Sequence, residues 1–413
     1  MNEGQLRAHS TAEAVARRSY GKLVAFLASR TRDVAAAEDA LSEAFAAALA
    51  DWPVKGVPAN PEAWLMTVAR RKWIDADRRR DRSGVVDEDL EQIAAVISAA
   101  PEGGQIPDRR LALMFACAHP AIDAAVRAPL ILQAIVGLDA ATIASAFLTS
   151  PTAMGKRLVR AKSKIREAGI PLRVPEREEL ASRLDAVLEA IYAAFAEGWS
   201  DAIGTDLLRR DLTSEALFLA RLVAEMLPHE PEALGLLALM LHAEARRRAR
   251  RNELGEYVPL NEQDTALWDA PMIAQAESLL LRASRWRVVG RYQLEAAVQS
   301  AHVARCRTGQ ANWQELTQIY DALLAITGSP VVAINRALAV AEVGGAKAGL
   351  ESLPDAEADA RLAGYQPYWA ARAELLARAG VKEEACHAYD LAVGLERDPA
   401  IREFLERRRA GLG

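Results

Sequence analysis

Basic side chains and one aromatic ring gather in the second half of a helix predicted over residues 61–82. Asn60 is suited to cap this helix, and Pro61 suits its first position. A basic helix face with an aromatic among the charges can bind nucleic acid, but a solvated basic helix end has the same composition. Trp73 could equally be a core residue. The candidate DNA-binding residues of this stretch are Arg70, Arg71, Lys72, Trp73, Arg78, Arg79 and Arg80.

A second basic helix is predicted over residues 152–168, as the last helix of a helix-turn-helix. Gly137 ends the first helix, Asp139 caps the next, and Ser150-Pro151 starts the last one. Early residues of such a helix read base edges in the major groove, although an ordinary amphipathic helix with a basic surface is the alternative. The predicted apolar stripe consists of Met154, Leu158, Ala161 and Ile165. The candidate DNA contacts are Thr152, Ala153, Lys156, Arg157, Arg160 and Lys162.

Charge is distributed unevenly along the 413 residues, and the net charge of -5 conceals two basic blocks. Residues 1–82 hold 14 basic and 11 acidic side chains, and residues 108–175 hold 10 and 4. Residues 83–107 hold 5 acidic and no basic side chains, with a Pro- and Gly-rich end that is typical of a linker. Residues 176–413 hold 27 basic and 36 acidic side chains. The net charge alone argues against nucleic acid, whereas the two blocks favour it.

The composition predicts an all-α protein of two or three units, because it is rich in Ala, Leu and Arg and has few β-branched runs. The sequence has no apolar run of about 18 residues that could span a membrane. Its first twenty residues lack the apolar core of a secretory signal. We therefore expect a cytoplasmic protein without a membrane partner. Its cysteines, Cys117, Cys306 and Cys386, are too scattered for a disulfide framework or a zinc site.

The sequence contains no recognisable catalytic or cofactor-binding motif. There is no Gly-rich phosphate loop and no nucleophile elbow. Cys117 and His119 supply at most two metal ligands and are predicted to form a structural turn. We therefore expect no enzyme activity, no metal and no cofactor. The residues that could otherwise serve as acid or base are Glu197, His229, His242 and Glu244.

An acidic motif precedes the first basic stretch, on a helix that Asp33 is predicted to cap and whose packed face includes Leu49. The segment AEDALSEAF over 37–45, followed by ARRKWID over 69–75, resembles region 2 of sigma-70-type factors of the extracytoplasmic-function class. The resemblance implies that the first helix docks on the β′ clamp helices of core RNA polymerase and that the second captures and opens the promoter -10 element. Without it, the acidic side chains would indicate only a solvated face. The implied polymerase-binding residues are Glu38, Asp39, Leu41, Ser42, Glu43 and Phe45.

The predicted helix-turn-helix also resembles a sigma region. The segment GLDAATIASAFLTSPTAMGKRLVRAKSKIREAG over 137–169 is similar to region 4, which implies contacts with the -35 element of promoter DNA and with the polymerase β flap. The acidic linker of the resembled family threads toward the active centre and the RNA exit path. The predicted domains are region 2 over 11–82, the acidic linker over 83–107, region 4 over 108–175 and an extension over 176–413.

Paired helices are predicted throughout the extension, which is expected to be an α-solenoid of tetratricopeptide-like helical hairpins. The last pair, over 367–379 and 382–395, comes nearest to the tetratricopeptide spacing. The earlier segments are 180–199, 231–241, 292–305 with 313–326, and 331–343 with 346–353. With LLRRDL over 207–212, the extension resembles that of the sigma subgroup called ECF42. This implies that it is needed for activity, either folding back on the sigma domains or contacting polymerase.

Two functions fit these patterns. A sigma factor would bind core polymerase and read two promoter elements, whereas a conventional helix-turn-helix regulator would bind duplex DNA without polymerase. The acidic motif over 37–45 favours the sigma factor. An arginine cluster over 246–251 in the extension could contact nucleic acid, polymerase or the acidic linker, or could be only a charged helix end.

Overall fold

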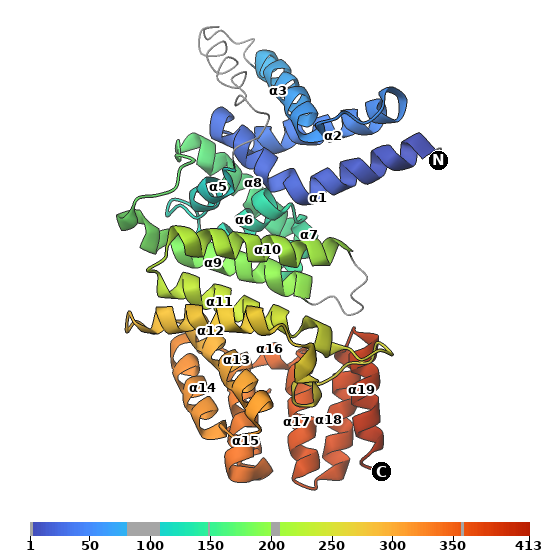
Figure 1. The fold of residues 1–413 in the computed structure, drawn as a ribbon, viewed down its shortest axis with the longest axis vertical. Coiled ribbons are helices and arrows are strands. Elements are labelled where there is room, and N and C mark those ends of the chain that lie inside the picture. Colours follow the sequence, from blue (N-terminus) through green and yellow to red (C-terminus); the bar gives the residue numbers. More distant parts are fainter. Residues whose placement is uncertain (1–2, 81–107, 148, 200–206, 357–358) are drawn as a thin grey trace. The chain divides into compact units, whose positions relative to one another are not determined.

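The computed structural model describes residues 3–80, 108–147, 149–199, 207–356 and 359–413, and its regular elements are all helical (Figure 1). This confirms the predicted all-α class. The chain divides into two compact units. The first contains residues 1–200 and 206–222, and the second contains 201–205 and 223–413. The predicted acidic linker over 83–107 lies outside the described residues.

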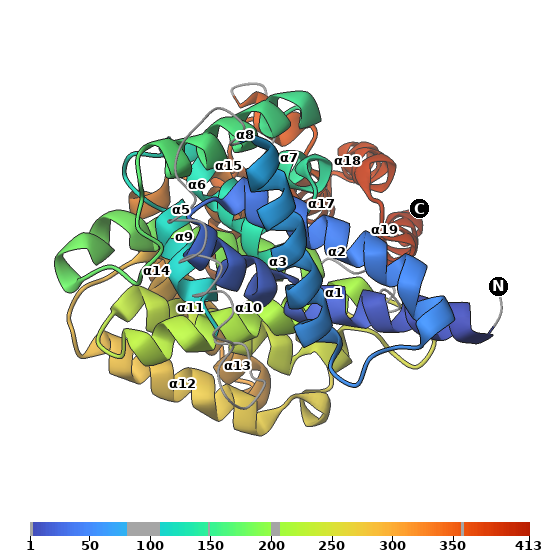
Figure 2. The same ribbon diagram turned by 90° about the horizontal axis from the view of Figure 1, so that it is seen from above.

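The first unit contains the two predicted sigma regions and the beginning of the predicted extension. Helices α1, α2 and α3 pack together (Figures 1 and 2), and α9 packs on α5 and α6. Residues on both sides of position 175 therefore share one core. The elements are α1 (Glu3–Thr31), α2 (Val34–Lys55), α3 (Pro61–Arg80), α5 (Arg110–Cys117), α6 (Ala124–Ile131), the π-helical η1 (Leu132–Val136), α7 (Ala140–Ala146), α8 (Pro151–Glu167), α9 (Arg177–Trp199) and α10 (Leu207–Met226), which ends in the second unit.

Four helices of the first unit begin at their predicted caps, one of them α7, where the Asp139 carboxylate accepts from the Thr142 amide (2.8 Å). The Asp33 carboxylate accepts a hydrogen bond from the Ala36 amide (3.0 Å) at the start of α2. At the start of α3, the Asn60 side chain accepts from the Ala63 amide (3.1 Å). The Ser150 hydroxyl likewise accepts from the amide of Ala153, two residues after Pro151. Each cap satisfies an amide that has no partner within its helix, which is why these starts could be predicted.

The helix before the turn begins earlier than its sequence suggests. The sequence over 128–136 can form this helix, but α6 begins at Ala124 because the Asp123 carboxylate accepts from the Ala125 amide (2.9 Å). It then continues as η1, a π-helical turn. Gly137 ends this turn with φ 78°, a left-handed conformation that glycine adopts without a steric penalty.

The second unit consists of paired helices, as predicted. The segments predicted over 292–305, 313–326, 367–379 and 382–395 are confirmed as α13, α14, α17 and α18. The helices are α11 (Pro231–Ala245), α12 (Ala270–Ser284), α13 (Arg291–Thr308), α14 (Trp313–Thr327), α15 (Pro330–Ser352), α16 (Ala360–Ala363), α17 (Gln366–Arg378), α18 (Lys382–Leu395) and α19 (Pro399–Ala410), with short 3-10 turns η2 (Arg247–Arg250), η3 (Leu260–Glu262) and η4 (Thr265–Leu267).

A glycine contact joins α11 and α13. A Cβ atom added at Gly235 would lie 2.6 Å from the Gln293 amide nitrogen, so the two helix backbones approach closely there. Beside this contact, the Glu232 carboxylate of α11 accepts hydrogen bonds from the amides of Tyr292 (3.0 Å) and Gln293 (3.1 Å). A carboxylate from α11 thus caps α13, where its charge also complements the helix dipole.

Helix α15 changes direction at Gly345, which has φ 86° and ψ 166°. This break divides the helix where the sequence predicted two segments, 331–343 and 346–353. Beyond the break, a Cβ atom added at Gly349 would lie 2.6 Å from the Ala341 Cβ and 2.9 Å from the Leu375 Cδ2. The end of α15 therefore packs back on its own first part and on α17.

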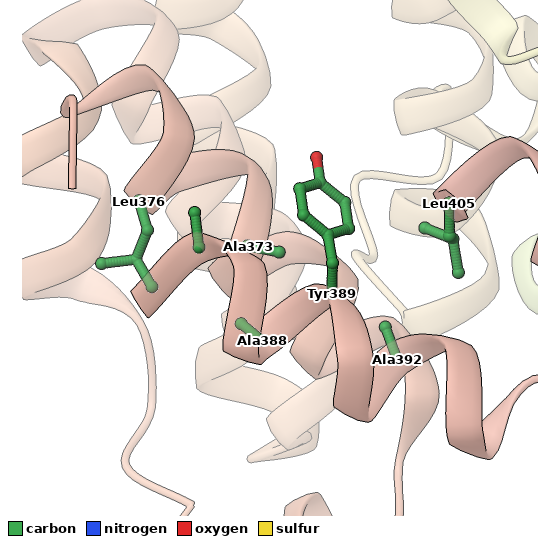
Figure 3. Packing of buried hydrophobic residues seen from close by; sticks show 7 residues of the cluster. Ala373, Leu376, Ala388, Tyr389, Ala392 and Leu405 are labelled. Carbon is green, nitrogen blue, oxygen red and sulfur yellow. The ribbon is translucent and has the colours of Figure 1, made fainter. Parts of the chain in front are cut away.

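Four alanines, with Leu376, Tyr389 and Leu405, form the core shared by α17, α18 and α19. Figure 3 shows Tyr389 of α18 among these side chains, with Ala373 of α17 and Leu405 of α19 close by. The Tyr389 hydroxyl donates a hydrogen bond to the Glu374 carboxylate (3.2 Å). The buried core residues are Ala373, Leu376, Ala385, Ala388, Tyr389, Ala392 and Leu405. Across the described residues, no helix has the length and apolarity needed to cross a membrane.

Candidate nucleic-acid interface

Helix α2 presents part of the predicted polymerase-binding motif to solvent. Asp39, Ser42 and Glu43 are exposed, while Phe45 is half-buried. Leu41 is completely buried, so in this structure it packs in the core and does not face a partner. Leu49, which was predicted to pack, is instead 40% exposed.

The remaining residue of the motif, Glu38, is already engaged by the predicted DNA-reading helix. The Lys162 ammonium of α8 pairs with the Glu38 carboxylate, and the two side chains are only 11% and 13% exposed. The Arg166 guanidinium of the same helix pairs with Asp33 (3.2 Å). Burial raises the pKa of Glu38, and the nearby Lys162 ammonium opposes that shift. In this structure the Lys162 side chain therefore points to α2, and its contact with DNA stays a prediction.

The other predicted DNA contacts on α8 lie away from this pairing. Met154, Leu158, Ala161 and Ile165 are buried, which confirms the predicted apolar stripe. Ala153 is half-buried at the start of the helix. The exposed face carries Thr152, Lys156, Arg157 and Arg160. The helix thus presents a basic face to solvent on a well-packed support, with Lys162 outside that face.

Helix α3 presents a smaller basic surface than its sequence suggests. Trp73 is only 7% exposed and packs as a core residue, which was the alternative that the sequence left open. Its role in stacking on a base stays a prediction that this structure does not favour. Lys72 pairs with Glu43 of α2 (3.2 Å), Arg71 is exposed and Arg70 is half-buried. The side chains of Arg78, Arg79 and Arg80 lie outside the described residues.

A close backbone contact brings the two predicted sigma regions together, and sequence reasoning missed it. A Cβ atom added at Gly21 of α1 would lie 1.9 Å from the Ile135 carbonyl oxygen of η1. A Cβ added at Gly137 would lie 3.1 Å from the Tyr20 ring. The one available signal was Gly21 itself, since glycine destabilises helix interiors and often marks a close approach.

Helices of the predicted extension also pack on predicted region 4. The Arg183 guanidinium of α9 donates to the Phe115 carbonyl of α5 (3.4 Å). The Arg110 guanidinium of α5 pairs with Asp108 (2.6 Å) and with Glu215 of α10. The Arg110 pairing lowers the pKa of Asp108 although burial of the carboxyl acts in the opposite direction. Buried charges thus tie these elements together.

In the turn that contains Cys117 and His119, both side chains serve the fold. Cys117 is completely buried at the end of α5, and burial raises the pKa of its thiol. The His119 Nδ1 accepts a hydrogen bond from the Ala121 amide (3.1 Å), which orders the turn. In the described part of the chain, no group of three or more His, Cys, Asp or Glu side chains is placed to hold a metal ion.

The candidate acid and base residues have separate surroundings. His242 is completely buried, with its Nε2 3.4 Å from Glu277 Oε1. Glu244 pairs with Arg247 (2.8 Å), and His229 packs against the Trp286 ring. Glu197 belongs to the first unit, whereas the other three belong to the second.

Comparison with known proteins identifies the N-terminal helices. Residues 15–83 match sigma-70 region 2, and residues 183–284 match a family of unknown function, DUF6596. An uncharacterized protein of Rhizobium meliloti (strain 1021) is 39% identical over 370 residues, which cover 88% of this chain and 87% of that protein. No solved structure matches the chain. The chain therefore belongs to the family of this Rhizobium protein and carries a sigma-70 region 2 domain, formed by α1, α2 and α3.

Proposed function

We propose that the protein is a sigma factor that binds core RNA polymerase and directs initiation at promoters with -35 and -10 elements. The observation that carries this proposal is the region 2 match over residues 15–83, in which the acidic face of α2 lies beside the basic helix α3. Region 2 is the part of sigma-70 factors that binds core polymerase. On α2, Asp39, Ser42 and Glu43 are exposed and would contact the β′ clamp helices.

Helix α8 is the proposed reader of the -35 element. Its exposed Thr152, Lys156, Arg157 and Arg160 follow a helix-turn-helix whose caps are formed by side chains. Such a helix enters the major groove with its first turns, where Arg and Lys most often pair with guanine. Region 4 would also contact the β flap.

The two proposed DNA-binding helices cannot read both elements in the arrangement of this structure. Lys162 of α8 pairs with Glu38 and Lys72 of α3 pairs with Glu43, five residues apart on α2, so the two pairs lie within about 20 Å of each other. Promoter elements about 25 base pairs apart are separated by about 85 Å of duplex. Binding to polymerase would therefore separate α8 from α2 and release Glu38 from Lys162.

The extension is proposed to regulate this separation. Its helices α9 and α10 hold the region 4 core through Arg183 and Glu215, so they travel with region 4 or restrain it. We propose a tetratricopeptide-like solenoid for the remaining helices, because α17 and α18 pair with small residues at their contact. Polymerase or the sigma domains would be its partners.

Run-off transcription with purified core RNA polymerase tests the function. We expect specific transcripts that require the protein and are lost with Asp39→Ala or Arg157→Ala. The matched controls are Asp51→Ala, on α2 outside the motif, and Arg173→Ala, beyond the end of α8. Absence of transcripts, together with salt-sensitive binding of the free protein to duplex DNA, would instead favour the conventional regulator.

A further inference from the structure

A cavity of 460 Å³ lies in the first unit, where region 2 meets the proposed region 4. Its walls come from α1, from η1 and α7, and from α9 and α10. It adjoins the close backbone contact between α1 and η1, because Gly21 and Ile135 are both among its lining residues. The exposed Glu13, Arg18 and Gly137 also line it, so the cavity opens to solvent and a small molecule can enter it.

Apolar groups supply much of the cavity wall. The Tyr20 ring adds an aromatic surface, which lies close to the backbone of Gly137. Cavities of about 300–1,000 Å³ with mainly apolar walls and a few polar groups are typical of small-molecule sites. The cavity therefore suits a ligand with an apolar body such as a fused ring system. The aliphatic lining side chains are Ala16, Ile135, Val136, Leu138 and Leu212.

The charged side chains that line the cavity are mostly acidic. Three carboxylates, from Glu13, Glu197 and Glu215, accompany one guanidinium, from Arg18. The pairing of Glu215 with Arg110 does not reverse this excess, because Arg110 also pairs with a second carboxylate outside the cavity. The surroundings of the cavity therefore favour a positively charged ligand over a negatively charged one.

Two shifted pKa values agree with this charge preference. Burial raises the pKa of the Tyr20 hydroxyl, and the Glu38 and Asp39 carboxylates raise it further. Burial likewise raises the pKa of Glu215, although the Arg110 guanidinium acts in the opposite direction. Both shifts mean that additional negative charge is unfavourable at the wall, whereas a cation placed there would offset the penalty.

We propose that this cavity binds a small amphipathic cation, an amine carried on an apolar ring system, and that the bound molecule holds region 2 against the proposed region 4. The ring system would lie against the aliphatic side chains, with the ammonium group beside the carboxylates. Because its walls belong to both regions, the ligand favours the arrangement in which α1 and η1 touch. This second part rests on the proposed sigma function, whereas binding of the cation does not.

Calorimetric titration of the full chain with tryptamine, an indole ring that carries an ammonium group, tests the site. We expect one molecule to bind per chain at millimolar concentration or below. Glu197→Gln removes a lining charge and should weaken binding about fivefold. Ala16→Leu fills part of the cavity and should weaken binding about tenfold or more. The matched controls are Asp185→Asn and Ala196→Leu, which are exposed on α9 outside the cavity and should bind as the wild type does.

The charge preference is tested with indole-3-acetate, which carries a carboxylate on the same ring and should bind about tenfold more weakly than tryptamine. Equal affinity for the two compounds would overturn the proposal of a cation site. Equal tryptamine affinity of the wild type, Glu197→Gln and Ala16→Leu would place the binding outside this cavity and overturn it as well. So would the absence of tryptamine binding at millimolar concentration.

Fluorescence anisotropy with labelled protein and core RNA polymerase tests the second part. At about ten times its dissociation constant, tryptamine should weaken the apparent affinity of the wild type for polymerase about tenfold, because it binds the closed arrangement. Tryptamine that binds without changing this affinity would show that the cavity does not hold the two regions together. A wild type that binds tryptamine but never binds polymerase would contradict the proposed function and leave the cation site standing.

Discussion

Both units use ion pairs and close glycine contacts, but they differ in which of the two holds the helices that the proposed function must move. In the first unit, helices far apart in the sequence are tied by charges, such as Lys162 to Glu38 and Arg110 to Glu215. In the second unit, small residues let helices pack closely, as at Gly235 and around Tyr389. An ion pair can exchange its partner for water or for another charge, whereas a close-packed contact opens only with loss of its apolar burial. We therefore expect rearrangement in the first unit and a fixed shape for the second.

The largest difference between the two units should be in how much stability each loses in acid. Burial and the Arg246 charge lower the pKa of His242 to about 4, while the solvated Glu277 carboxylate 3.4 Å away does not offset them. Because the folded pKa is below the unfolded value near 6.5, the neutral imidazole stabilises the fold above pH 6.5. That stability, about 3 kcal/mol, is lost as the pH falls from about 6.5 to 4.

In the first unit, the lowered pKa of Asp108 implies that the stability from its pairing with Arg110 is lost only below about pH 3.8. Hydrogen exchange measured by mass spectrometry between pH 7 and pH 4 should therefore show α11 and α12 opening before α5. His242→Leu should remove the pH dependence of α11. Earlier opening of α5 would contradict this difference between the units.

A methyl group at the α11–α13 contact should be the next largest effect. Gly235→Ala places a Cβ 2.6 Å from the Gln293 amide nitrogen, which a backbone can relieve only by shifting. We expect a loss of about 2 kcal/mol in the free energy of unfolding, measured with urea. Gly394→Ala in α18 is the matched control, since nothing lies within 4 Å of its added Cβ. An unchanged Gly235→Ala midpoint would mean that the second unit is less rigidly packed than we infer.

The equivalent change in the first unit should instead increase the affinity for core polymerase. Gly21→Ala favours helix α1 by about 0.5–1 kcal/mol, but its Cβ would lie 1.9 Å from the Ile135 carbonyl oxygen. Region 2 should stay folded while the proposed region 4 moves away, so the affinity for core polymerase should rise about tenfold. Fluorescence anisotropy with labelled protein measures this, again with Gly394→Ala as the control. Equal affinity for Gly21→Ala and wild type would show that the contact does not limit polymerase binding.

Charge reversal at the α2–α8 pair should have the smallest effect. Lys162→Glu or Glu38→Lys alone places like charges together, whereas the double reversal restores the pair. A double-mutant cycle on urea unfolding should give a coupling of about 1 kcal/mol. Independent effects of the two substitutions would mean that the ion pair does not help to hold α8 against α2.

Local signals predicted much of the fold. Caps at Asp33, Asn60 and Ser150 set helix starts because each satisfies amides within a few residues. The buried stripe of α8 follows from helical periodicity alone. The break at Gly345 likewise fell between two segments that were predicted separately.

Long-range contacts were not predictable from those signals. Lys162 lies on the same helix as Arg157, and no local rule says that one reaches Glu38, 124 residues away, while the other faces solvent. Trp73 sits among charges in the sequence but is covered in the fold. The packing of α9 on α5 likewise joins segments that composition had assigned to different domains.

The reversal at Gly345 fixes how the last part of α15 is oriented about its own axis. One residue advances an α-helix by about 100°, and Gly349 is seated against both Ala341 and Leu375 within one turn of the break. Inserting a single residue just before Gly345 would therefore rotate the Gly349 surface that contacts α17 by more than a quarter turn. The packing of the second unit should therefore tolerate changes of side chain on either side of the break more readily than a change in the number of residues from Ala341 to Gly349.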